Sequence, residues 1–134
     1  MVTGDLFVLD ASVGVKWFKD ERGSDDARGL ISRLGEASVR LVVPSVFPFE
    51  VVDVARRIFG LGDARRVWEE VCAAGLVVAG SDEALFRETL RYANHLGCTL
   101  YDAAAPALAD RLGCPLVSAD RRAHGRLEGV RLIG

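Results

Sequence analysis

Short apolar runs alternate along this chain with longer stretches of helical periodicity. The runs are almost continuously apolar, for example DLFVLD, RLVV and PLVS, which is typical of strands in a parallel sheet that helices cover on both faces. Strands are predicted over residues 5–10, 40–43, 76–79, 115–118 and 130–133, and helices over residues 11–15, 24–37, 47–59, 63–74, 82–95 and 100–112. The sequence therefore predicts an α/β fold, a small parallel sheet of about five strands flanked by helices.

The chain has the length of one domain, which we expect to span residues 1–134. Its formal net charge of −2 provides no global basic field of the kind that favours nucleic-acid binding. The cysteines Cys72, Cys98 and Cys114 lack C-x-x-C spacing and are predicted to be buried free thiols. The N-terminus lacks the features of a signal peptide, and no apolar run approaches the ~20 residues of a membrane span, so we expect a soluble, cytoplasmic protein.

Four isolated acids lie where apolar segments end or are interrupted. Asp10 closes LFVLD, Glu50 closes LVVPSVFPFE, Asp102 interrupts TLYDAAAPALA and Asp120 closes PLVSAD. A carboxylate against apolar surface is costly unless it is paired, and no basic residue is placed locally to pair with any of the four. Because ligand sites of open α/β sheets lie at the carboxyl ends of the strands, we expect the four acids to converge on one site.

Each acid taken alone has a simpler structural explanation. Asp10 and Asp120 could each cap a short helix that follows a strand. Asp102 could complete a capping box with Thr99, although a cap leaves one carboxylate oxygen free for a metal. Glu50 is harder to explain in this way, because it borders the apolar stripe of its helix. That stripe is predicted to comprise Phe47, Val51, Val54 and Ile58.

Two neighbouring residues bear on the geometry of such a site. Asp53 lies on the same side of its helix as Glu50, one turn later, and could instead form a surface ion pair with Arg57. Pro106 falls inside the alanine-rich helix that carries Asp102. Its missing N–H predicts either a bend in that helix or a shifted start.

A cluster of carboxylates indicates a hydrolytic metal site. The acids repel one another unless a cation holds them ionised, and hard oxygen ligands favour Mg²⁺ or Mn²⁺. A metal held in this way can activate water and orient a phosphodiester. Neither His95 nor His124 has a convincing partner for nucleophilic catalysis in the sequence, and zinc ligation by these histidines with Cys98 and Cys114 matches no usual spacing.

Four motifs in one order resemble those of PIN-domain ribonucleases, specifically the VapC-type toxins of toxin–antitoxin pairs. They are VLDASV at residues 8–13, P-x-x-x-x-x-EVV at 44–52, YDAAAPALA at 101–109 and LVSADRR at 116–122. The resemblance implies a Mg²⁺- or Mn²⁺-dependent endoribonuclease with a PIN-like fold, which forms a homodimer and is silenced by a cognate antitoxin protein. It implies Asp10, Glu50, Asp102 and Asp120 as catalytic and metal-binding residues, with Ser12 and Ser118 as supporting hydroxyls.

Three positions depart from the pattern of this family. Asp53 stands where an Asn is common, Ser118 replaces the commoner Thr, and Pro106 replaces an ordinary helix former. Asp53 adds negative charge beside the acids as a further supporting residue, and Pro106 bears on the geometry around Asp102. Because all four acids are present, we expect an active enzyme.

The leading hypothesis is hydrolysis of RNA with the 3′ oxygen as leaving group, which leaves 3′-hydroxyl and 5′-phosphate ends. Arg121, Arg122 and Arg126 are candidates for contacts with backbone phosphates. Three alternatives remain open: a housekeeping RNA-processing nuclease of the same fold, a non-catalytic PIN-like interaction scaffold, and a phosphatase of the haloacid dehalogenase type. The last requires a second Asp two residues after the strand-end Asp10, where this chain has Ser12.

Overall fold

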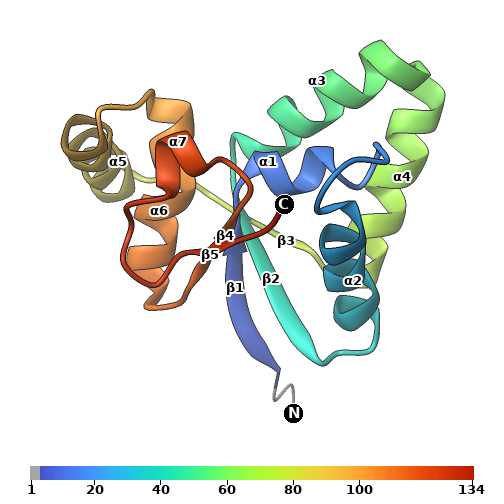
Figure 1. Cartoon of the computed structure of the whole chain (residues 1–134), viewed down its shortest axis with the longest axis horizontal. Coiled ribbons are helices and arrows are strands. Elements are labelled where there is room, and N and C mark those ends of the chain that lie inside the picture. The colour runs from blue at the N-terminus through green and yellow to red at the C-terminus, as the bar shows by residue number, and fades with distance from the viewer. Residues whose placement is uncertain (1–3) are drawn as a thin grey trace.

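The computed structural model describes residues 4–134 and contains one five-stranded sheet with helices on both sides (Figure 1). The strands are β1 (Asp5–Leu9), β2 (Val39–Pro44), β3 (Val77–Ala79), β4 (Leu116–Ser118) and β5 (Arg131–Leu132). The helices are α1 (Ala11–Val15), α2 (Ser24–Gly35), α3 (Phe47–Phe59), α4 (Leu61–Ala74), α5 (Glu83–Leu96), α6 (Leu100–Leu112) and α7 (Arg121–His124).

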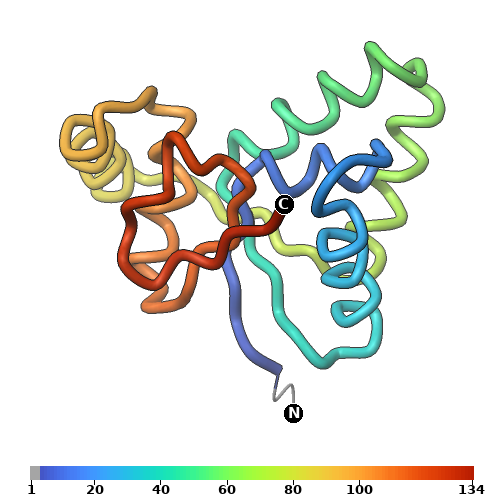
Figure 2. The backbone as a smooth tube through the Cα atoms, in the orientation of Figure 1, coloured from blue at the N-terminus to red at the C-terminus, as the bar shows by residue number. Residues whose placement is uncertain are grey.

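The sheet has the strand order β3-β2-β1-β4-β5, and every pair of neighbouring strands is parallel. All carboxyl ends of the strands therefore lie along one edge. The chain starts in the middle of the sheet, at β1, and builds outward in both directions (Figure 2). The predicted α/β fold with about five parallel strands is confirmed.

Alternate residues of the strands serve two separate cores. Phe7 and Leu9 of β1 point into a core shared with α1, α2, α3 and α4, whereas Val8 between them points into a core shared with α5 and α6. Figure 1 shows these two groups of helices on opposite sides of the sheet. Covering both faces explains why the strands lack polar alternation in the sequence.

Most predicted elements are confirmed, with three corrections. The helices predicted over residues 11–15, 47–59 and 100–112 have those bounds in the structure, and the start of the last is not shifted by Pro106. The short helix α7 was not among the predicted ranges, although Asp120 was considered as the cap of a helix at this position, and it is that cap. Ile58 was expected on a buried stripe but is 47% exposed, because the core contact at this end of α3 is made by the fully buried Ala55. The cysteines are free as predicted, but none is fully buried: Cys72 is exposed, and Cys98 and Cys114 are partly buried.

One glycine allows α1 to lie against α3. A Cβ added to Gly14 would come within 2.6 Å of the Phe47 ring and 2.7 Å of a methyl group of Val51. Both distances are shorter than real contacts, so any other residue at position 14 would push the two helices apart. This close approach matters because Asp10 caps α1 and Glu50 lies in the first turn of α3.

Within residues 4–134, no helix has the length and apolar character that crossing a membrane requires.

Candidate functional site

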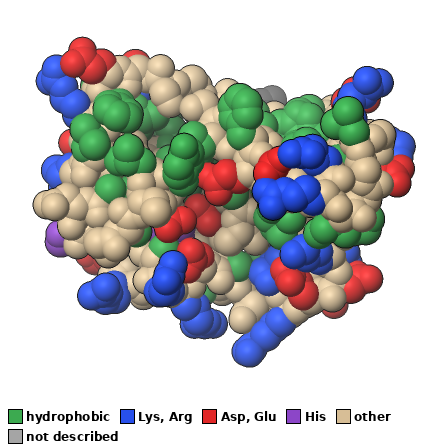
Figure 3. Space-filling view, turned by 90° about the horizontal axis from the view of Figure 1, so that it is seen from above, with side chains coloured by type: hydrophobic (Ala, Val, Ile, Leu, Met, Phe, Trp, Pro, Cys, Tyr) green, Lys and Arg blue, Asp and Glu red, His purple; other side chains and the backbone are tan. Residues whose placement is uncertain are grey.

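The four acids predicted to converge all lie at the carboxyl edge of the sheet. Asp10 directly follows β1, and Asp120 follows β4 after one intervening residue. Glu50 lies in the first turn of α3, the helix after β2, and Asp102 lies in the first turn of α6. Figure 3 views this edge from above and shows acidic side chains in the middle of the face, with hydrophobic side chains on both sides.

Asp10 is the most buried of the four acids. It is 7% exposed, and its carboxylate accepts a hydrogen bond of 3.0 Å from the backbone N–H of Ser12 as the N-cap of α1. The predicted capping role is therefore real. Burial raises the pKa of Asp10, hydrogen bonding to Ser12 and the proximity of His124 oppose that rise, and the charge of Asp102 adds to it.

Glu50 carries the largest resolved effect of the clustered charge. Its half-buried side chain has its pKa raised from 4.5 to about 7, first by burial and then by the charges of Asp10 and Asp102. Two acids distant in the sequence therefore lie close enough to disfavour ionisation of a third. The three carboxylates form one electrostatic unit.

Asp102 and Asp120 both lie at helix N-termini, with different capping roles. Thr99 caps α6 through its hydroxyl, which accepts a 3.1 Å hydrogen bond from the backbone N–H of Asp102. In the described chain, no bond from Thr99 to the Asp102 carboxylate completes the capping box, so this carboxylate is free of the cap. Asp120 caps α7 itself and accepts a 3.0 Å hydrogen bond from the N–H of Ala123.

Cys98 places Asp120 in the same electrostatic neighbourhood. The pKa of its thiol is raised by burial, and then by the charges of Asp102, Asp120 and Asp10. A single side chain just before α6 therefore senses three acids that come from three different elements. Together with the effects on Glu50, this shows that the fold brings all four acids to one region.

Ser12 and Ser118 connect the elements that carry these acids. The Ser12 hydroxyl accepts a 3.0 Å hydrogen bond from the N–H of Ala119 and lies 3.4 Å from the Ser118 hydroxyl. Ser118 in turn accepts a 3.0 Å bond from the N–H of Asp120. The two hydroxyls thus join α1 to the turn between β4 and α7.

His124 is a residue of the site that the sequence did not identify. It has two hydrogen-bond partners, although they do not form the nucleophilic arrangement that the sequence argued against. Its ring is fully buried, with Nδ1 2.6 Å from the Ser118 hydroxyl and Nε2 2.5 Å from the backbone carbonyl of Asp102. This Ser–His pair cannot act as a nucleophile on a substrate, because Ser118 is also fully buried. The pair is structural.

The remaining predicted residues lie on the surface around the acids. Asp53 forms ion pairs with Arg56 at 2.7 Å and with Arg57, and hydrogen bonds from these arginines hold its pKa below the usual value. The ion pair predicted with Arg57 is confirmed, and Arg56 joins it. Arg121, Arg122 and Arg126 are exposed and form no salt bridge within residues 4–134, which is also true of Arg22, Arg33, Arg40 and Arg131.

The donor set of this site suits a hard divalent cation. Within residues 4–134, no three His, Cys, Asp or Glu side chains are grouped so closely that they already form a metal site. All four converging side chains are nevertheless carboxylates, the ligands that Mg²⁺ and Mn²⁺ prefer. A cation would neutralise the charges of Asp10 and Asp102, which add to the effect of burial in raising the pKa of Glu50.

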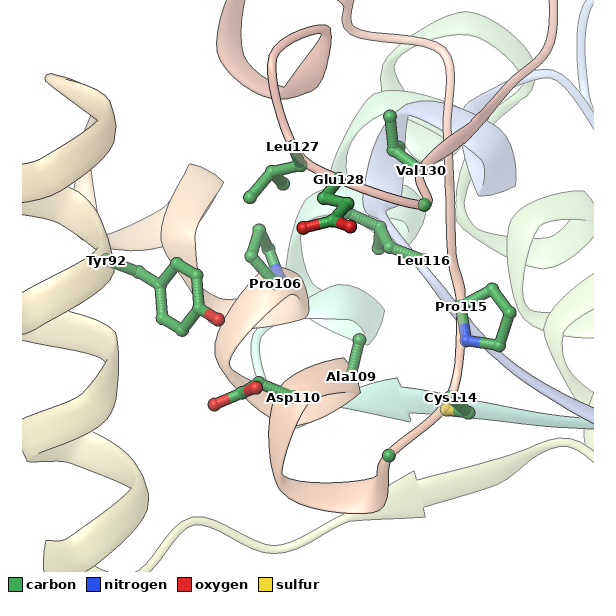
Figure 4. Close-up of a pocket in the computed structure, with 12 residues that line it drawn as sticks. Tyr92, Pro106, Ala109, Asp110, Cys114, Pro115, Leu116, Leu127, Glu128 and Val130 are labelled. Atoms are coloured by element: carbon green, nitrogen blue, oxygen red, sulfur yellow. The ribbon is translucent and has the colours of Figure 1, made fainter.

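A separate pocket of about 390 Å³ lies between α5, α6 and the segments that flank β4 (Figure 4). Its lining includes Tyr92, Pro106, Asp110 and Glu128 and contains none of the four converging acids. The pocket is therefore distinct from the candidate site. Pro106 lines it together with Ala109 and Asp110 of the same helix, and it lies about one turn after Asp102.

The fold is similar to those of toxins from toxin–antitoxin systems. A DNA-bound VapBC complex from Salmonella typhimurium matches with a TM-score of 0.72 at 19% identity, covering 96% of both chains. A VapC toxin of Mycobacterium tuberculosis that cleaves the sarcin-ricin loop matches with a TM-score of 0.74 at 12% identity, covering 96% of this chain and 99% of that chain. A toxin–antitoxin complex from Klebsiella pneumoniae matches with a TM-score of 0.69 at 16% identity, covering 95% of both chains.

No curated protein sequence matches this chain significantly. The model of one family does match it: the PIN domain, over residues 7–129. That range begins in β1 and ends just before β5, so it includes all four acids and the elements that carry them. The chain therefore belongs to the PIN domain family, and its structural neighbours include VapC toxins of VapBC complexes.

Proposed function

We propose that this protein is a Mg²⁺- or Mn²⁺-dependent endoribonuclease and the toxin of a toxin–antitoxin pair. The observation that carries the proposal is the convergence of Asp10, Glu50, Asp102 and Asp120 from four separate elements, where burial, and then the charges of Asp10 and Asp102, raise the pKa of Glu50 to about 7. Membership of the PIN domain family and the likeness to VapC toxins support it.

The four acids would share the work of holding the cation. Asp10, Asp102 and Asp120 are its chief ligands in this proposal, and Glu50 is a further ligand or the base. When bound, the cation supplies an activated water and neutralises charge on the phosphodiester. The pKa of Glu50 is raised to about 7 in the metal-free protein, and a cation beside it would favour the ionised carboxylate, the form that can serve as ligand or base.

The proposed substrate is RNA, and three arginines beside the acids are proposed to bind it. Attack on phosphorus with the 3′ oxygen as leaving group yields 3′-hydroxyl and 5′-phosphate ends. The exposed Arg121 and Arg122 follow Asp120 directly on α7, and Arg126 lies just beyond that helix. In this proposal they contact backbone phosphates of the RNA.

A cognate antitoxin and a second copy of the chain are the proposed protein partners. Two of the three structural neighbours described above were crystallised as complexes with an antitoxin. Several large apolar side chains of the helices around the site are exposed, among them Phe49, Leu61 and Tyr101, each more than 60%. Covering such surface would stabilise a complex, whereas Phe47, which is fully buried, contributes only to the core.

The activity is tested with purified protein and RNA of defined sequence. We expect Asp102→Asn to abolish cleavage that depends on Mg²⁺ or Mn²⁺ while leaving the urea unfolding midpoint nearly unchanged, because the Asp102 carboxylate takes no part in the cap of α6. Asp110→Asn, on the exposed far end of the same helix, is the matched control and should cleave at the wild-type rate. Equal cleavage by the wild type and Asp102→Asn would refute the site.

The identity as a toxin is tested in cells. Inducible expression of the wild type, but not of Asp102→Asn, should arrest growth, and mapping of RNA 5′ ends should reveal a dominant cut site. Cleavage without growth arrest would favour a housekeeping nuclease. Absence of any cleavage, together with tight binding of a partner protein, would favour a non-catalytic scaffold.

A further inference from the structure

Pro106 leaves one backbone carbonyl of α6 without its helical partner. In an α-helix the carbonyl of residue 102 accepts from the N–H of residue 106, but proline has no N–H and its ring crowds that carbonyl. The residue whose carbonyl is released in this way is Asp102, one of the four acids. An unpaired carbonyl inside a protein costs free energy, so another donor is required.

His124 supplies that donor from a different part of the chain. Its Nε2 lies 2.5 Å from the Asp102 carbonyl oxygen, although the two residues are 22 positions apart. A carbonyl oxygen can only accept, so Nε2 must carry a proton. Nδ1 of the same ring lies 2.6 Å from the Ser118 hydroxyl.

Through the Ser118 hydroxyl, the same ring links Asp102 to the backbone N–H of Asp120 and to the hydroxyl of Ser12. Ser118 accepts a 3.0 Å bond from the N–H of Asp120 and lies 3.4 Å from the Ser12 hydroxyl, which is two residues from Asp10. His124 and Ser118 are both fully buried, so water does not compete for these bonds. One continuous network therefore joins the backbones of α1, α6 and α7.

We propose that His124 is a positioning residue, which takes the place of the helical donor removed by Pro106 and thereby fixes Asp102 relative to Asp10 and Asp120. Pro106 and His124 act as a pair: proline frees the Asp102 carbonyl, and histidine uses it to hold α6 against α7. The inference rests on the proposed function only in naming the cation that these acids hold. The hydrogen bond itself is independent of any activity.

A double-mutant cycle tests the pairing with Mn²⁺ as the probe. The four proteins are the wild type, His124→Phe, Pro106→Ala and Pro106→Ala/His124→Phe, with Mn²⁺ affinity measured by titration calorimetry. His124→Phe should weaken Mn²⁺ binding by about tenfold or more, as loss of residues that orient metal ligands does. In the Pro106→Ala background, His124→Phe should weaken Mn²⁺ binding clearly less, because the introduced alanine has an N–H that can pair with the Asp102 carbonyl.

Two further variants separate positioning from general damage. His124→Gln keeps an N–H donor near the position of Nε2 and should retain most of the affinity that His124→Phe loses. His95→Phe, which changes the exposed histidine on α5, is the matched control and should bind Mn²⁺ as the wild type does. Unchanged binding by His124→Phe, or an equal loss in both backgrounds, would overturn the proposal.

Measurements without metal keep this proposal distinguishable from the proposed function. Urea unfolding of the same four proteins should show that His124→Phe lowers the midpoint more with Pro106 present than in the Pro106→Ala background. The ¹⁵N NMR spectrum of the histidine rings should show Nε2 of His124 protonated; a ring protonated at Nδ1 alone would refute the hydrogen bond. A further outcome is that the unfolding cycle and the NMR spectrum give the expected results while the wild type neither binds Mn²⁺ nor cleaves RNA. In that case the proposed function fails, and the pairing of Pro106 with His124 stands.

Discussion

Among single residues, Glu50 shows most directly what the fold does to its site. The side chain is only half-buried, yet its pKa is raised to about 7, because the charges of Asp10 and Asp102 add to the effect of burial. Carboxylates whose pKa is raised by burial and by neighbouring charges are typical of functional sites. The cost of assembling the site therefore has measurable consequences for stability and for metal binding.

The stability of the metal-free protein should fall as pH rises from about 4.5 to 7. Glu50 binds its proton more tightly in the folded state, so its contribution to stability is complete below its usual pKa of 4.5 and is lost as pH passes the folded value of about 7. Glu50→Gln should be more stable than the wild type at pH 8 in the presence of a chelator, and the difference should shrink toward pH 5. Urea unfolding at both pH values measures this; identical pH dependence in the two proteins would contradict it.

Titration of Glu50 should also change the metal affinity, which should rise with pH whereas the stability falls. A proton on Glu50 competes with the cation, so Mn²⁺ affinity of the wild type should rise about tenfold between pH 6 and pH 8, as expected for one group that titrates near 7. Glu50→Gln should bind Mn²⁺ more weakly and with less pH dependence. Calorimetric titrations across this range test the prediction, and an equally steep profile in Glu50→Gln would assign the titration to another group.

At the scale of elements, α1 and α3 approach closely, and each begins at or near one of the acids, Asp10 and Glu50. Gly14 is the contact point, since a Cβ there would meet Phe47 and Val51 at less than 3 Å. The requirement for glycine is one of space, because no positive φ is involved. A small residue in a five-residue helix thus controls the geometry of two acids on different elements.

Gly14→Ala should lower the free energy of unfolding by about 1–3 kcal/mol, the usual cost of overpacking, and should also weaken Mn²⁺ binding by moving Asp10 away from Glu50. Gly29→Ala in α2 is the matched control, since a Cβ there meets nothing within 4 Å. That control should gain about 0.5–1 kcal/mol from helix propensity and bind Mn²⁺ normally. Urea unfolding and calorimetry provide both readouts. If Gly14→Ala instead raised the free energy of unfolding, α1 could move away from α3 without a loss of stability, and the prediction would be wrong.

For the whole molecule, a net charge of −2 conceals an uneven distribution. Acids gather in the middle of the face at the carboxyl edge of the sheet, as Figure 3 shows. Three unpaired arginines follow the last of these acids, whereas those of α4 are paired along their helix, Arg65 with Glu69 and Arg66 with Glu70, at 3.2 Å each. Unpaired arginines are the ones available to phosphates.

Replacing Arg121, Arg122 and Arg126 by Gln should weaken binding of single-stranded RNA uniformly across sequences. Each lost phosphate contact should reduce the slope of log affinity against log salt by about 0.7, so the triple variant should lose about 2 from the slope. The experiment is a salt titration of RNA binding by the Asp102→Asn protein with Ca²⁺ present. Arg65→Gln/Arg66→Gln is the control, and an equal loss of slope in that control would indicate a diffuse field rather than a local contact.

Local patterns were enough to predict most elements and the positions of the acids. Helix α3 has the bounds predicted from its stripe, and Asp10 and Asp120 could be placed at strand ends, because strands and helices differ in apolar periodicity over a few residues. The parallel arrangement followed from the same patterns. The carboxyl edge of the sheet could therefore be predicted as the place of the site.

Features that depend on contacts between distant residues could not be predicted in this way. The exposure of Ile58 and the two partners of His124 are of this kind. Pro106 lacks an N–H and so leaves the Asp102 carbonyl without its helical donor, but no pattern in the sequence identified His124, 22 residues further on, as the replacement donor. The sequence by itself determined which carboxylates lie at the carboxyl edge of the sheet, because the positions of strand ends and helix starts depend on neighbouring residues. Only the tertiary structure decided how these carboxylates are held. Their supporting hydrogen bonds depend on which backbone groups remain unpaired after folding and which distant side chains reach them.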